Sequence, residues 1–372
     1  MSLGKTKLTI ISPYPPESGG LSTYTKRLYD YLKTRREITI RVVPLNSITD
    51  IPKLFNLRSG NPDYIRLEYN IPAYGFSTIP LFVIVLFYRL FTPIKLVVNY
   101  HEVSRETQML GFFGRIFYFT FSSIFHHIYV HTTEAKSILI NRCRINSAKI
   151  TVIAHGITIL DGGTKKPSLI RKHYGLDSRK IILLFGFIHP DKGIEYALKA
   201  LALIKRSNKN IFGNIQLVIA GDIRMRGGIF KIFQNKDKEY KLKLLSLVRE
   251  LELDGSVTFL SYIEPTLVKS LLQSAYIALM PYVRVEQSGV LNLLLPIGKP
   301  IIASNIGGLG ETLKDTGILV GVGEVGEIVK QIKKLLQDKM YYTEVKRSYQ
   351  KLTKQLDTSN VVNQFITSLN SI

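Results

Sequence analysis

Short apolar runs that alternate with longer amphipathic stretches are the feature that most constrains the fold of this chain. Runs with the character of strands lie at Leu8–Ile11, Ile38–Val43, Tyr64–Leu67, Leu96–Asn99, Ile128–Val130, Ile150–Ile153, Ile181–Phe185, Gln216–Ala220, Val257–Leu260, Tyr276–Met280, Pro300–Ala303 and Gly317–Val320. The segments between them have the apolar spacing of helices. Strands that alternate with helices pair in parallel, with helices on both faces of the sheet. The sequence therefore predicts an α/β protein.

The length of the chain and one change of composition predict two domains. A chain of 372 residues is too long for one ordinary hydrophobic core. The polar stretch Asp161–Pro167 interrupts the alternation and is typical of a linker. We therefore expect an N-terminal domain at 1–160 and a C-terminal domain at 161–351. The last segment, 352–372, has a helical pattern.

Charge and cysteine content restrict the environment and the partners. The formal net charge is +22, a field that attracts phosphates, nucleic acid or an anionic membrane surface without choosing among them. The single cysteine, Cys143, excludes an intramolecular disulfide and fits a reducing compartment. The first residues lack the pattern of a signal peptide. These features predict a cytoplasmic protein.

Two very apolar stretches leave membrane contact open. Ile79–Phe91 is interrupted by Arg89 and is shorter than the roughly 20 apolar residues that a membrane span needs. We expect it to be a buried helix. Phe112–Phe125 is rich in aromatic residues, which is expected of a helix packed on the sheet. The alternative is a basic-edged apolar surface, which with Arg115 and the net charge would suit a lipid-linked acceptor.

The segment Pro281–Glu311 has the pattern of a phosphate site. After an apolar strand it passes Glu286 and opens a helix at Ser288-Gly289-Val290. The first N–H groups of a helix have no partner within it and attract phosphate. Glu286 cannot bind phosphate but can accept hydrogen bonds from sugar hydroxyls. A sugar nucleotide fits both groups, although a carboxylate and a glycine at a helix start are also ordinary capping residues.

Other predicted strand ends carry groups of the same kind. Gly19-Gly20 lies between the first strand and its helix, where the N–H groups could face a phosphate or could merely form a turn. Gly186 follows a strand, and Lys192 lies at the next helix start, where an ammonium and N–H groups would meet one anion. His101 follows a strand at the expected edge of the sheet and suits hydrogen bonding or proton transfer.

Five loops, PYPPESGG, NYHE, FGFIHPDKG, EQSGV and NIGGLGE, occur in the order seen in family 4 glycosyltransferases, which the chain resembles over nearly its whole length. This resemblance implies the GT-B fold, in which two Rossmann-like domains face one another across a cleft and the last helix crosses back to the first domain. It also implies a nucleobase pocket near Tyr262 and Ile263, and retention of anomeric configuration. Donor contacts are implied at Gly19, Gly20, Gly186, Lys192, Glu286, Ser288, Gly289 and Val290.

The sequence departs from the family pattern at two positions. Phe187 stands where an arginine is common in the diphosphate loop, so Lys192 would carry the phosphate charge with less help. Leu294 occupies the position of a second glutamate that holds ribose in the family, so ribose recognition must come from elsewhere or be weaker. His155-Gly156 resembles the turn that ends the first domain in the family, and we expect a structural role for His155.

We expect no metal and no cofactor. The sequence has no Asp-x-Asp motif, and His127 and His131 have no carboxylate or thiol at ligand spacing. Protein cations and helix ends would instead stabilise the departing diphosphate.

The sequence therefore predicts a hexosyltransferase with catalytic roles for His101, Lys192 and Glu286. Its partners would be a nucleotide sugar donor, a glycan or lipid-linked acceptor and an anionic membrane surface, with no nucleic acid. A sugar-nucleotide epimerase of the same fold and a noncatalytic nucleotide-sugar-binding protein are the alternatives. The scattered lysines and the lack of a recognised module argue against nucleic-acid binding.

Overall fold

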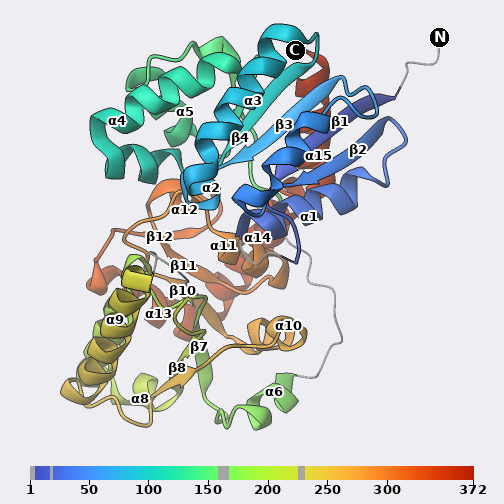
Figure 1. The fold of residues 1–372 in the computed structure, drawn as a ribbon. Coiled ribbons are helices and arrows are strands. Elements are labelled where there is room, and N and C mark those ends of the chain that lie inside the picture. Colours follow the sequence, from blue (N-terminus) through green and yellow to red (C-terminus); the bar gives the residue numbers. More distant parts are fainter. Residues whose placement is uncertain (1–4, 17–19, 158–166, 225–230) are drawn as a thin grey trace. The chain divides into compact units, whose positions relative to one another are not determined.

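The computed structural model describes residues 5–16, 20–157, 167–224 and 231–372. Contacts divide the chain into two compact units, unit 1 at Met1–Gly156 with Leu356–Ile372 and unit 2 at Ile157–Gln355. The predicted boundary at residue 160 lies among residues outside the described ranges. Figure 1 shows both units, which are considered separately below.

Unit 1 is built on a parallel sheet with the strand order β2-β1-β3-β4-β5-β6 within the described residues. Its strands are β1 (Thr6–Ser12), β2 (Ile38–Pro44), β3 (Tyr64–Tyr69), β4 (Lys95–Tyr100), β5 (His127–Val130) and β6 (Ile150–Val152). The chain passes from β1 to β2 on one side and then returns to β3 on the other side of β1. The order of strands therefore reverses between β1 and β3, and such a reversal opens a crevice at the carboxyl ends of the strands.

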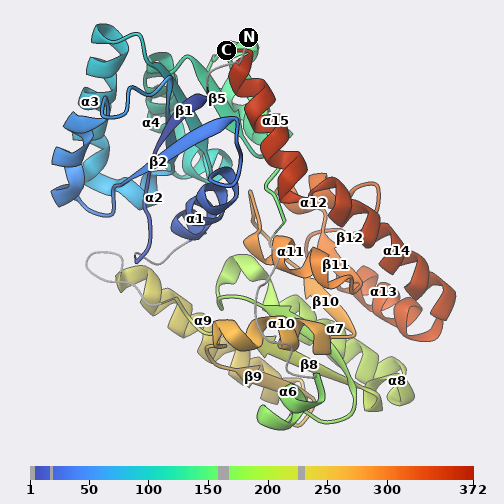
Figure 2. The same cartoon turned by 90° about the vertical axis from the view of Figure 1, so that its right-hand side faces the viewer.

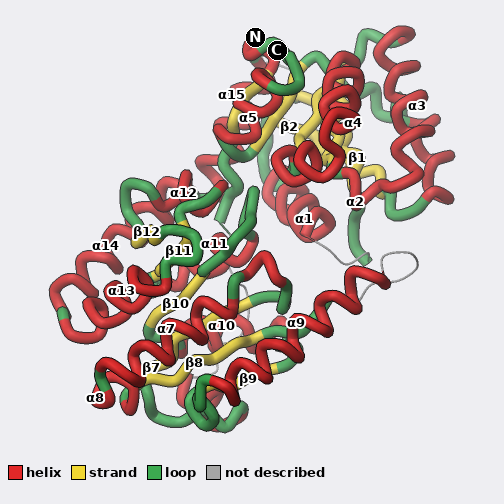
Figure 3. The backbone as a smooth tube through the Cα atoms, turned by 90° about the vertical axis from the view of Figure 1, so that its left-hand side faces the viewer, coloured by secondary structure: helices red, strands yellow, loops and turns green. Residues whose placement is uncertain are grey.

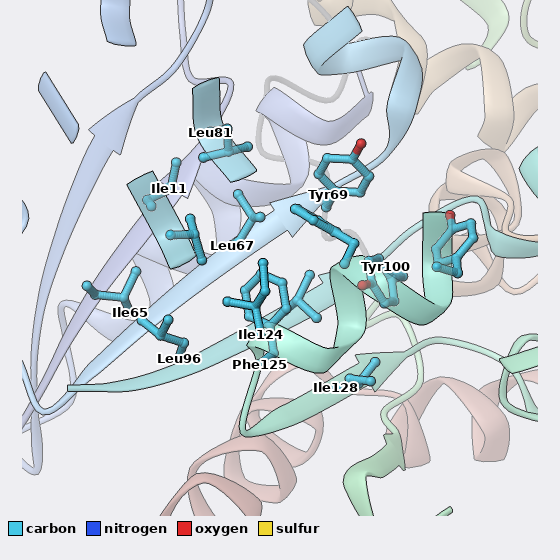
Figure 4. Close-up of a cluster of buried hydrophobic side chains, with 14 of the residues drawn as sticks. Ile11, Ile65, Leu67, Tyr69, Leu81, Leu96, Tyr100, Ile124, Phe125 and Ile128 are labelled. Atoms are coloured by element: carbon cyan, nitrogen blue, oxygen red, sulfur yellow. The ribbon is translucent and has the colours of Figure 1, made fainter. Parts of the chain in front are cut away.

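Helices and short 3-10 turns connect these strands. They are α1 (Gly20–Leu32), η1 (Ile48–Asn56), α2 (Ile71–Tyr74), η2 (Gly75–Ser77), α3 (Thr78–Phe91), α4 (Val103–Ile124), α5 (Thr133–Asn141) and η3 (Ser147–Lys149). One core lies between the sheet and the helices α3 and α4, where Leu67, Leu81 and Phe125 are among the buried side chains (Figure 4). Gly111, with φ near 55°, kinks α4.

The last helix, α15 (Thr358–Asn370), belongs to unit 1 although the preceding helix α14 belongs to unit 2 (Figure 2). Phe365 and Leu369 pack with Ile10, Leu32 and Tyr129 in a second core. The helical pattern predicted from residue 352 is interrupted, since α14 ends at Gln355 and Asp357 caps α15 by accepting a hydrogen bond from the Ser359 N–H at 2.9 Å.

Unit 2 repeats the architecture, with the strand order β12-β11-β10-β7-β8-β9 in its described part (Figure 3). Its strands are β7 (Lys180–Phe185), β8 (Ile215–Ala220), β9 (Val257–Leu260), β10 (Ile277–Met280), β11 (Ile301–Ser304) and β12 (Ile318–Val320). Its helices are α6 (Pro167–His173), α7 (Ile194–Ser207), α8 (Lys209–Gly213), α9 (Lys231–Glu250), α10 (Pro265–Ser274), α11 (Gly289–Leu294), α12 (Gly307–Leu313), α13 (Val325–Gln337) and α14 (Lys339–Gln355). Here the order reverses between β7 and β10.

Two local expectations are corrected. In the stretch NIGGLGE, which the sequence predicts as a loop, the part from Gly307 to Glu311 is the start of the helix α12. The helix predicted at Ile79–Phe91 is buried only on the face that carries Leu81, Ile84 and Tyr88. Its other face is apolar but exposed to solvent, because a single layer of helices covers the sheet there.

Candidate functional site

The carboxyl edge of the sheet in unit 1 holds a buried polar network around Glu68. Glu68, the fifth residue of β3, is completely buried, and its carboxylate accepts a hydrogen bond from Arg66 Nε. The amide of Asn99 donates to Glu68 Oε2 at 2.7 Å. Arg66 and Glu68 can form an ion pair because residues two apart on a strand project from the same face of the sheet. A buried ion pair is stable only when its hydrogen bonds are made with good geometry. The network therefore holds the side chains of Glu68 and Asn99 in fixed positions at this edge of the sheet.

His101 joins this network from the end of β4. Its Nε2 lies 2.8 Å from Glu68 Oε2, so the Nε2–H donates to the carboxylate. This contact fixes the tautomer and leaves Nδ1 as the nitrogen that can accept a proton or hydrogen bond. The ring of Tyr24, from α1, packs edge-on against His101 with centroids 5.0 Å apart. His101 is therefore oriented by a buried carboxylate rather than by solvent.

Two more histidines line the same network. The His131 Nδ1–H donates to the carbonyl of Ile153 at 2.9 Å, and Nε2 accepts from the Asn99 amide at 3.2 Å. The ring of His155 lies 5.2 Å from that of His131 and 4.8 Å from that of Tyr24. The three histidines differ in exposure, because His131 is buried whereas His155 is half-buried and 11% of the His101 side chain is accessible.

Burial and charge set the protonation of this network. Burial disfavours the Glu68 carboxylate, but the charge of Arg66 and the hydrogen bonds from His101 and Asn99 outweigh burial and lower its pKa to about 2. Burial, with a smaller contribution from His101, lowers the pKa of His155 to about 4. The pKa of His131 is also well below its ordinary value, first because of burial. At neutral pH the network holds one ionised carboxylate beside neutral His131 and His155.

The glycine pair predicted after β1 is described only in part. Gly19 lies outside the described residues. Gly20 is the first residue of α1 and is exposed, and a Cβ atom there would meet nothing within 4 Å. The N-terminal turn of α1 is therefore accessible at the end of β1, beside the reversal of strand order.

The carboxyl edge of unit 2 is built from backbone contacts at the β7–β10 reversal. Gly193, with φ near +58°, ends the short turn η4 (Pro190–Lys192), and a Cβ atom there would lie 2.1 Å from the Pro281 carbonyl. The Val283 N–H donates to the Asp191 carbonyl at 2.9 Å. The loop that carries Lys192 is thus held against the loop that follows β10.

Lys192 is held by an aromatic ring. Its ammonium lies 3.8 Å from the centroid of the Tyr282 ring. Tyr282 is 2% exposed, and its hydroxyl is buried with no hydrogen-bond partner among the described residues. A cation over an aromatic face is stabilised by the ring quadrupole, which positions the charge without neutralising it. Lys192 therefore keeps its capacity to bind an anion.

Glu286 and the start of α11 lie in the same group of loops. The Glu286 side chain is buried, and the main-chain carbonyl of Glu286 accepts a hydrogen bond from the Gly308 N–H at 2.9 Å. A Cβ atom on Gly308 would lie 2.4 Å from that carbonyl, and one on Gly307 would lie 2.0 Å from the Val285 carbonyl. The glycines of NIGGLGE are thus required by the close approach of α12 to the loop of Glu286.

The residues predicted to surround a phosphate at α11 take different positions. Ser288 caps the helix, and its hydroxyl accepts from the Leu291 N–H at 3.3 Å. Gly289 is exposed, and a Cβ atom there would meet nothing within 4 Å. Gly186 has φ near +119°, and a Cβ atom on it would lie 3.2 Å from Val290 Cγ2. The carboxyl end of β7 therefore lies next to the start of α11.

Two predicted contacts lie apart from these loops. Tyr262 and Ile263 follow β9, which is the edge strand, and β8 separates β9 from β7. Tyr262 is 71% exposed, whereas Ile263 is buried. Phe187, at the position where the family has arginine, is exposed.

Glu68 and Tyr282 belong to the two sites but were not predicted from the sequence. The expected strand ended at Leu67, one residue before Glu68, and it was treated as an apolar run. The usable signal was the pair Arg66 and Glu68, two opposite charges two residues apart in a strand otherwise buried. Tyr282 carried no comparable signal, because its contact with Lys192 joins positions 90 residues apart.

No group of three or more histidine, cysteine, aspartate or glutamate side chains is arranged to hold a metal in the described part of the chain. His127 and His131, the pair considered from the sequence, have other contacts. The Nε2 of His127 lies 2.8 Å from the Thr151 hydroxyl, and His131 belongs to the Glu68 network.

Comparisons with known proteins agree with this architecture. The family model for glycosyl transferases group 1 matches residues 167–355, just over half of the chain. Alpha-D-kanosaminyltransferase of Streptomyces kanamyceticus is 27% identical over 172 residues, which are 45% of this chain and 39% of that protein. An uncharacterized glycosyltransferase of Methanocaldococcus jannaschii is 29% identical over 191 residues, 49% of this chain and 44% of that protein. The matched part thus spans less than half of the length of these relatives.

A solved structure matches both units. Anabaena HepE, in crystal structures with UDP and glucose and with UDP-glucose, superposes with a TM-score of 0.72 at 16% identity. The match covers 99% of this chain and 100% of that one. The two Rossmann-like α/β units are therefore those of the GT-B fold, as the sequence predicted.

Proposed function

The chain belongs to the glycosyl transferases group 1 family, and from this premise we propose that it is a retaining, family 4 hexosyltransferase. It would move a hexosyl-type group from a nucleotide diphosphate sugar to a hydroxyl of a glycan or lipid-linked glycan. The observation that supports this most is Lys192. It lies at the β7–β10 reversal of unit 2, where the family binds diphosphate, and it is held over the ring of Tyr282.

The reaction breaks the bond between the anomeric carbon and the diphosphate oxygen and forms a bond from that carbon to the acceptor oxygen. The acceptor hydroxyl loses its proton, and negative charge develops on the departing nucleoside diphosphate. Lys192 and the N–H groups near Gly20 and Gly289 stabilise this charge. Glu286 accepts hydrogen bonds from the sugar hydroxyls and orients the sugar.

His101 has a different task in this proposal. Its Nε2–H is committed to Glu68, so Nδ1 is the atom that holds a hydroxyl of the acceptor or of the sugar. With the Nε2–H donated to Glu68, the ring presents Nδ1 as a hydrogen-bond acceptor. The role of Glu68 is to position His101.

The donor is bound without a metal ion in this proposal, because the sequence has no Asp-x-Asp motif and Lys192 supplies positive charge. The base is read by main-chain groups near Tyr262 and Ile263. Leu294 is buried in the helix α11, so a side chain at that position cannot hold ribose.

The protein works in the cytoplasm, at the surface of a membrane where a lipid-linked acceptor is present. The basic net charge supports this placement, since anionic headgroups attract a cationic protein. The complexes of Anabaena HepE make UDP and its sugar conjugates the first donors to examine.

A thermal-shift panel tests the proposed donor site. UDP, GDP, ADP and their common sugar conjugates are added to the wild type, to Lys192→Ala and to Lys199→Ala, each in the presence of EDTA. Lys199 is a matched control, because it also lies near an aromatic ring, Tyr196, but is exposed on α7. We expect one nucleotide family to raise the melting temperature of the wild type and of Lys199→Ala but not of Lys192→Ala.

The selected sugar nucleotide is then incubated with glycan and polyprenyl-linked acceptors. A glycosylated product with retained configuration supports the proposal. A product that is still a nucleotide sugar would identify an epimerase instead, and binding without turnover on any acceptor would identify a noncatalytic binding protein. If no nucleotide stabilises the wild type, the donor site at Lys192 is wrong.

A further inference from the structure

Large apolar side chains are exposed together on two neighbouring helices of unit 1. The most exposed are Phe76, 80% accessible in the turn η2 just before α3, Phe113, 77% accessible in the second half of α4, and Ile79, 70% accessible at the start of α3. We call the surface formed by the outward residues of these helices the α3–α4 face, and it is represented by Phe76, Ile79, Phe87, Met109, Phe112 and Phe113. Soluble monomers rarely expose so large an apolar area without a binding role.

The helices that carry these residues, α3 and α4, are in contact with one another. The rings of Phe82 and Phe121 stack between the helices with centroids 5.8 Å apart. Glu106, buried in α4, accepts from the Ile71 N–H at 2.7 Å and also from the hydroxyl of Tyr118. The ring stack therefore joins α3 to α4, and the bond from Ile71 ties α4 to α2, the helix that precedes α3.

The exposed residues are not needed for the interior. The inward faces of the same helices already fill the core with Leu81, Val85 and Phe121. A soluble helix normally places polar residues on its outer face, and α3 places Ile79, Val83 and Phe87 there. The outer apolar side chains therefore do not contribute to the core within the described part of unit 1.

The α3 region could cross a membrane by length and composition, but its connections prevent this. Among the described residues one stretch, Ile71–Phe91, has this character, with 21 residues and a mean hydropathy of 1.8. The strands before and after it, β3 and β4, pair in one sheet from Tyr64 with Lys95 to Tyr69 with Tyr100. A helix between two paired strands must return along that sheet, so α3 can lie on a bilayer but not span it.

Positive charge predominates around this face. Between Ile71 and Phe125 the acidic residues are Glu102 and Glu106, and Glu106 is buried. Four cations gather where α3 and α4 end. Arg58 donates to the Phe91 carbonyl at 2.9 Å, Lys149 donates to the Phe125 carbonyl at 3.1 Å, and Arg89 contacts His126. Lys95 is close enough to help lower the pKa of His126, after burial, Arg89 and Lys149.

We propose that the α3–α4 face binds the surface of an anionic phospholipid bilayer. Its aromatic and aliphatic side chains enter the interface between headgroups and acyl chains, and the cations at the ends of α3 and α4 contact phosphate groups. A second copy of the chain fits this face less well, because self-association would bring the same cations of both copies together.

The proposal deepens the proposed function, on which it rests for its purpose: the face keeps the enzyme where a lipid-linked acceptor is embedded. α4 begins three residues after Tyr100, the last residue of β4, and His101 lies in that connection. The same helix that meets the bilayer therefore starts at the network that holds His101. Binding to lipid itself requires no catalysis and can be measured separately.

Flotation with vesicles tests the face. Full-length protein is mixed with vesicles of phosphatidylcholine alone or with phosphatidylglycerol, at low and high salt. The variant Phe76→Gln, Phe112→Gln, Phe113→Gln removes exposed apolar groups that make no core contact, and Arg58→Gln, Arg115→Gln removes charge. The control is Leu242→Gln, Met340→Gln, which alters equally exposed apolar residues of unit 2.

We expect at least tenfold stronger binding to vesicles with phosphatidylglycerol, and at least tenfold loss in the phenylalanine variant. The charge variant should lose the preference for anionic lipid, and the control should bind as the wild type does. Equal binding by the phenylalanine variant, or no binding by the wild type, would overturn the proposal. A lipid-free dimer that only this variant abolishes would also overturn it, in favour of a second copy.

Nucleotide stabilisation of the same samples separates the two proposals. The phenylalanine variant should keep the thermal shift of the wild type with the selected nucleotide, because unit 2 is unchanged. Lipid binding without nucleotide binding would contradict the donor site while leaving the α3–α4 face intact. Nucleotide binding without lipid binding would contradict the face alone.

Discussion

The carboxyl edges of the two sheets are built in opposite ways. In unit 1 the edge consists of buried polar side chains, Glu68, Asn99 and His131, that are joined by hydrogen bonds from the Asn99 amide. In unit 2 it consists of loops in close backbone contact, with glycines at the points of approach and one half-buried cation, Lys192. Two similar folds thus produce one edge suited to orienting a reactive side chain and one suited to admitting an anion.

The difference has a consequence for mutagenesis. Changes in the side-chain network of unit 1 should alter stability and protonation together, because each member satisfies a buried partner. Changes in unit 2 should affect stability and binding separately, since the glycines hold the fold whereas Lys192 is proposed to bind the ligand.

The largest effect is expected for Glu68→Gln. This change leaves Arg66 buried without a full counter-charge and should destabilise the fold by about 4 kcal/mol. Denaturant unfolding measures the loss. Asp63→Asn is the control, because its carboxylate accepts only an exposed bond from the Lys7 N–H. A loss below about 1 kcal/mol for Glu68→Gln would mean that the network does not depend on the ion pair.

Gly307→Ala tests the backbone contacts of unit 2. A Cβ atom at φ near +48° would lie 2.0 Å from the Val285 carbonyl, so we expect a destabilisation of about 3 kcal/mol. The matched change Gly289→Ala meets open space and should alter stability by less than about 0.5 kcal/mol. If the proposed phosphate site is right, Gly289→Ala should nevertheless weaken nucleotide binding. Equal stability of the two variants would show that α12 does not approach this loop closely.

Acid should destabilise unit 1 through its buried histidines. The folded pKa of His155 is about 4 and the unfolded value is about 6.5, so the unfolded chain binds the extra proton between these values. Stability is therefore complete above pH 6.5 and falls as the pH drops toward 4. We expect a loss of about 2 kcal/mol from this group at pH 5.

Unfolding at pH 7 and pH 5 measures this loss, and His155→Gln should reduce it. Glu68 acts in a lower window, since its stabilisation is lost only as the pH falls from about 4.5 toward about 2. An unchanged pH dependence in His155→Gln would show that His155 is not buried in its neutral form.

The smallest effect is expected for Tyr282→Phe. The buried hydroxyl has no hydrogen-bond partner in the described part of the chain, so its removal should change stability by less than about 1 kcal/mol. The ring under Lys192 is kept, and nucleotide affinity should stay within twofold. Tyr282→Leu removes the ring and should weaken nucleotide binding more. Equal affinities of these two variants would exclude a positioning role for the ring.

Most of the fold follows from periodicity, whereas the site follows only in part. The strands β7 and β10 are recognisable because parallel strands buried on both faces are continuous apolar runs. The loops of Lys192 and Glu286 could be located because they follow these strands. The contacts that hold them, such as Gly193 against Pro281, join distant positions and leave no periodic signal.

The outer face of α3 shows another limit of the sequence. A helix that is apolar all round is expected to be buried, and Ile79–Phe91 was interpreted in that way. In the structure only one face of α3 is buried, because no further element packs over its other face in the described part of unit 1. Composition identified the unusual helix, but only tertiary structure shows which residues stay exposed.

In the proposed function, unit 2 binds the nucleotide and the network of unit 1 acts on the sugar or the acceptor. Titration calorimetry with the nucleoside diphosphate that the thermal-shift panel selects, on wild type, Lys192→Ala and His101→Ala, tests it most directly. The account predicts at least tenfold weaker binding for Lys192→Ala and binding within twofold of the wild type for His101→Ala. Equal affinities for all three proteins, or a loss in His101→Ala as large as in Lys192→Ala, would contradict it.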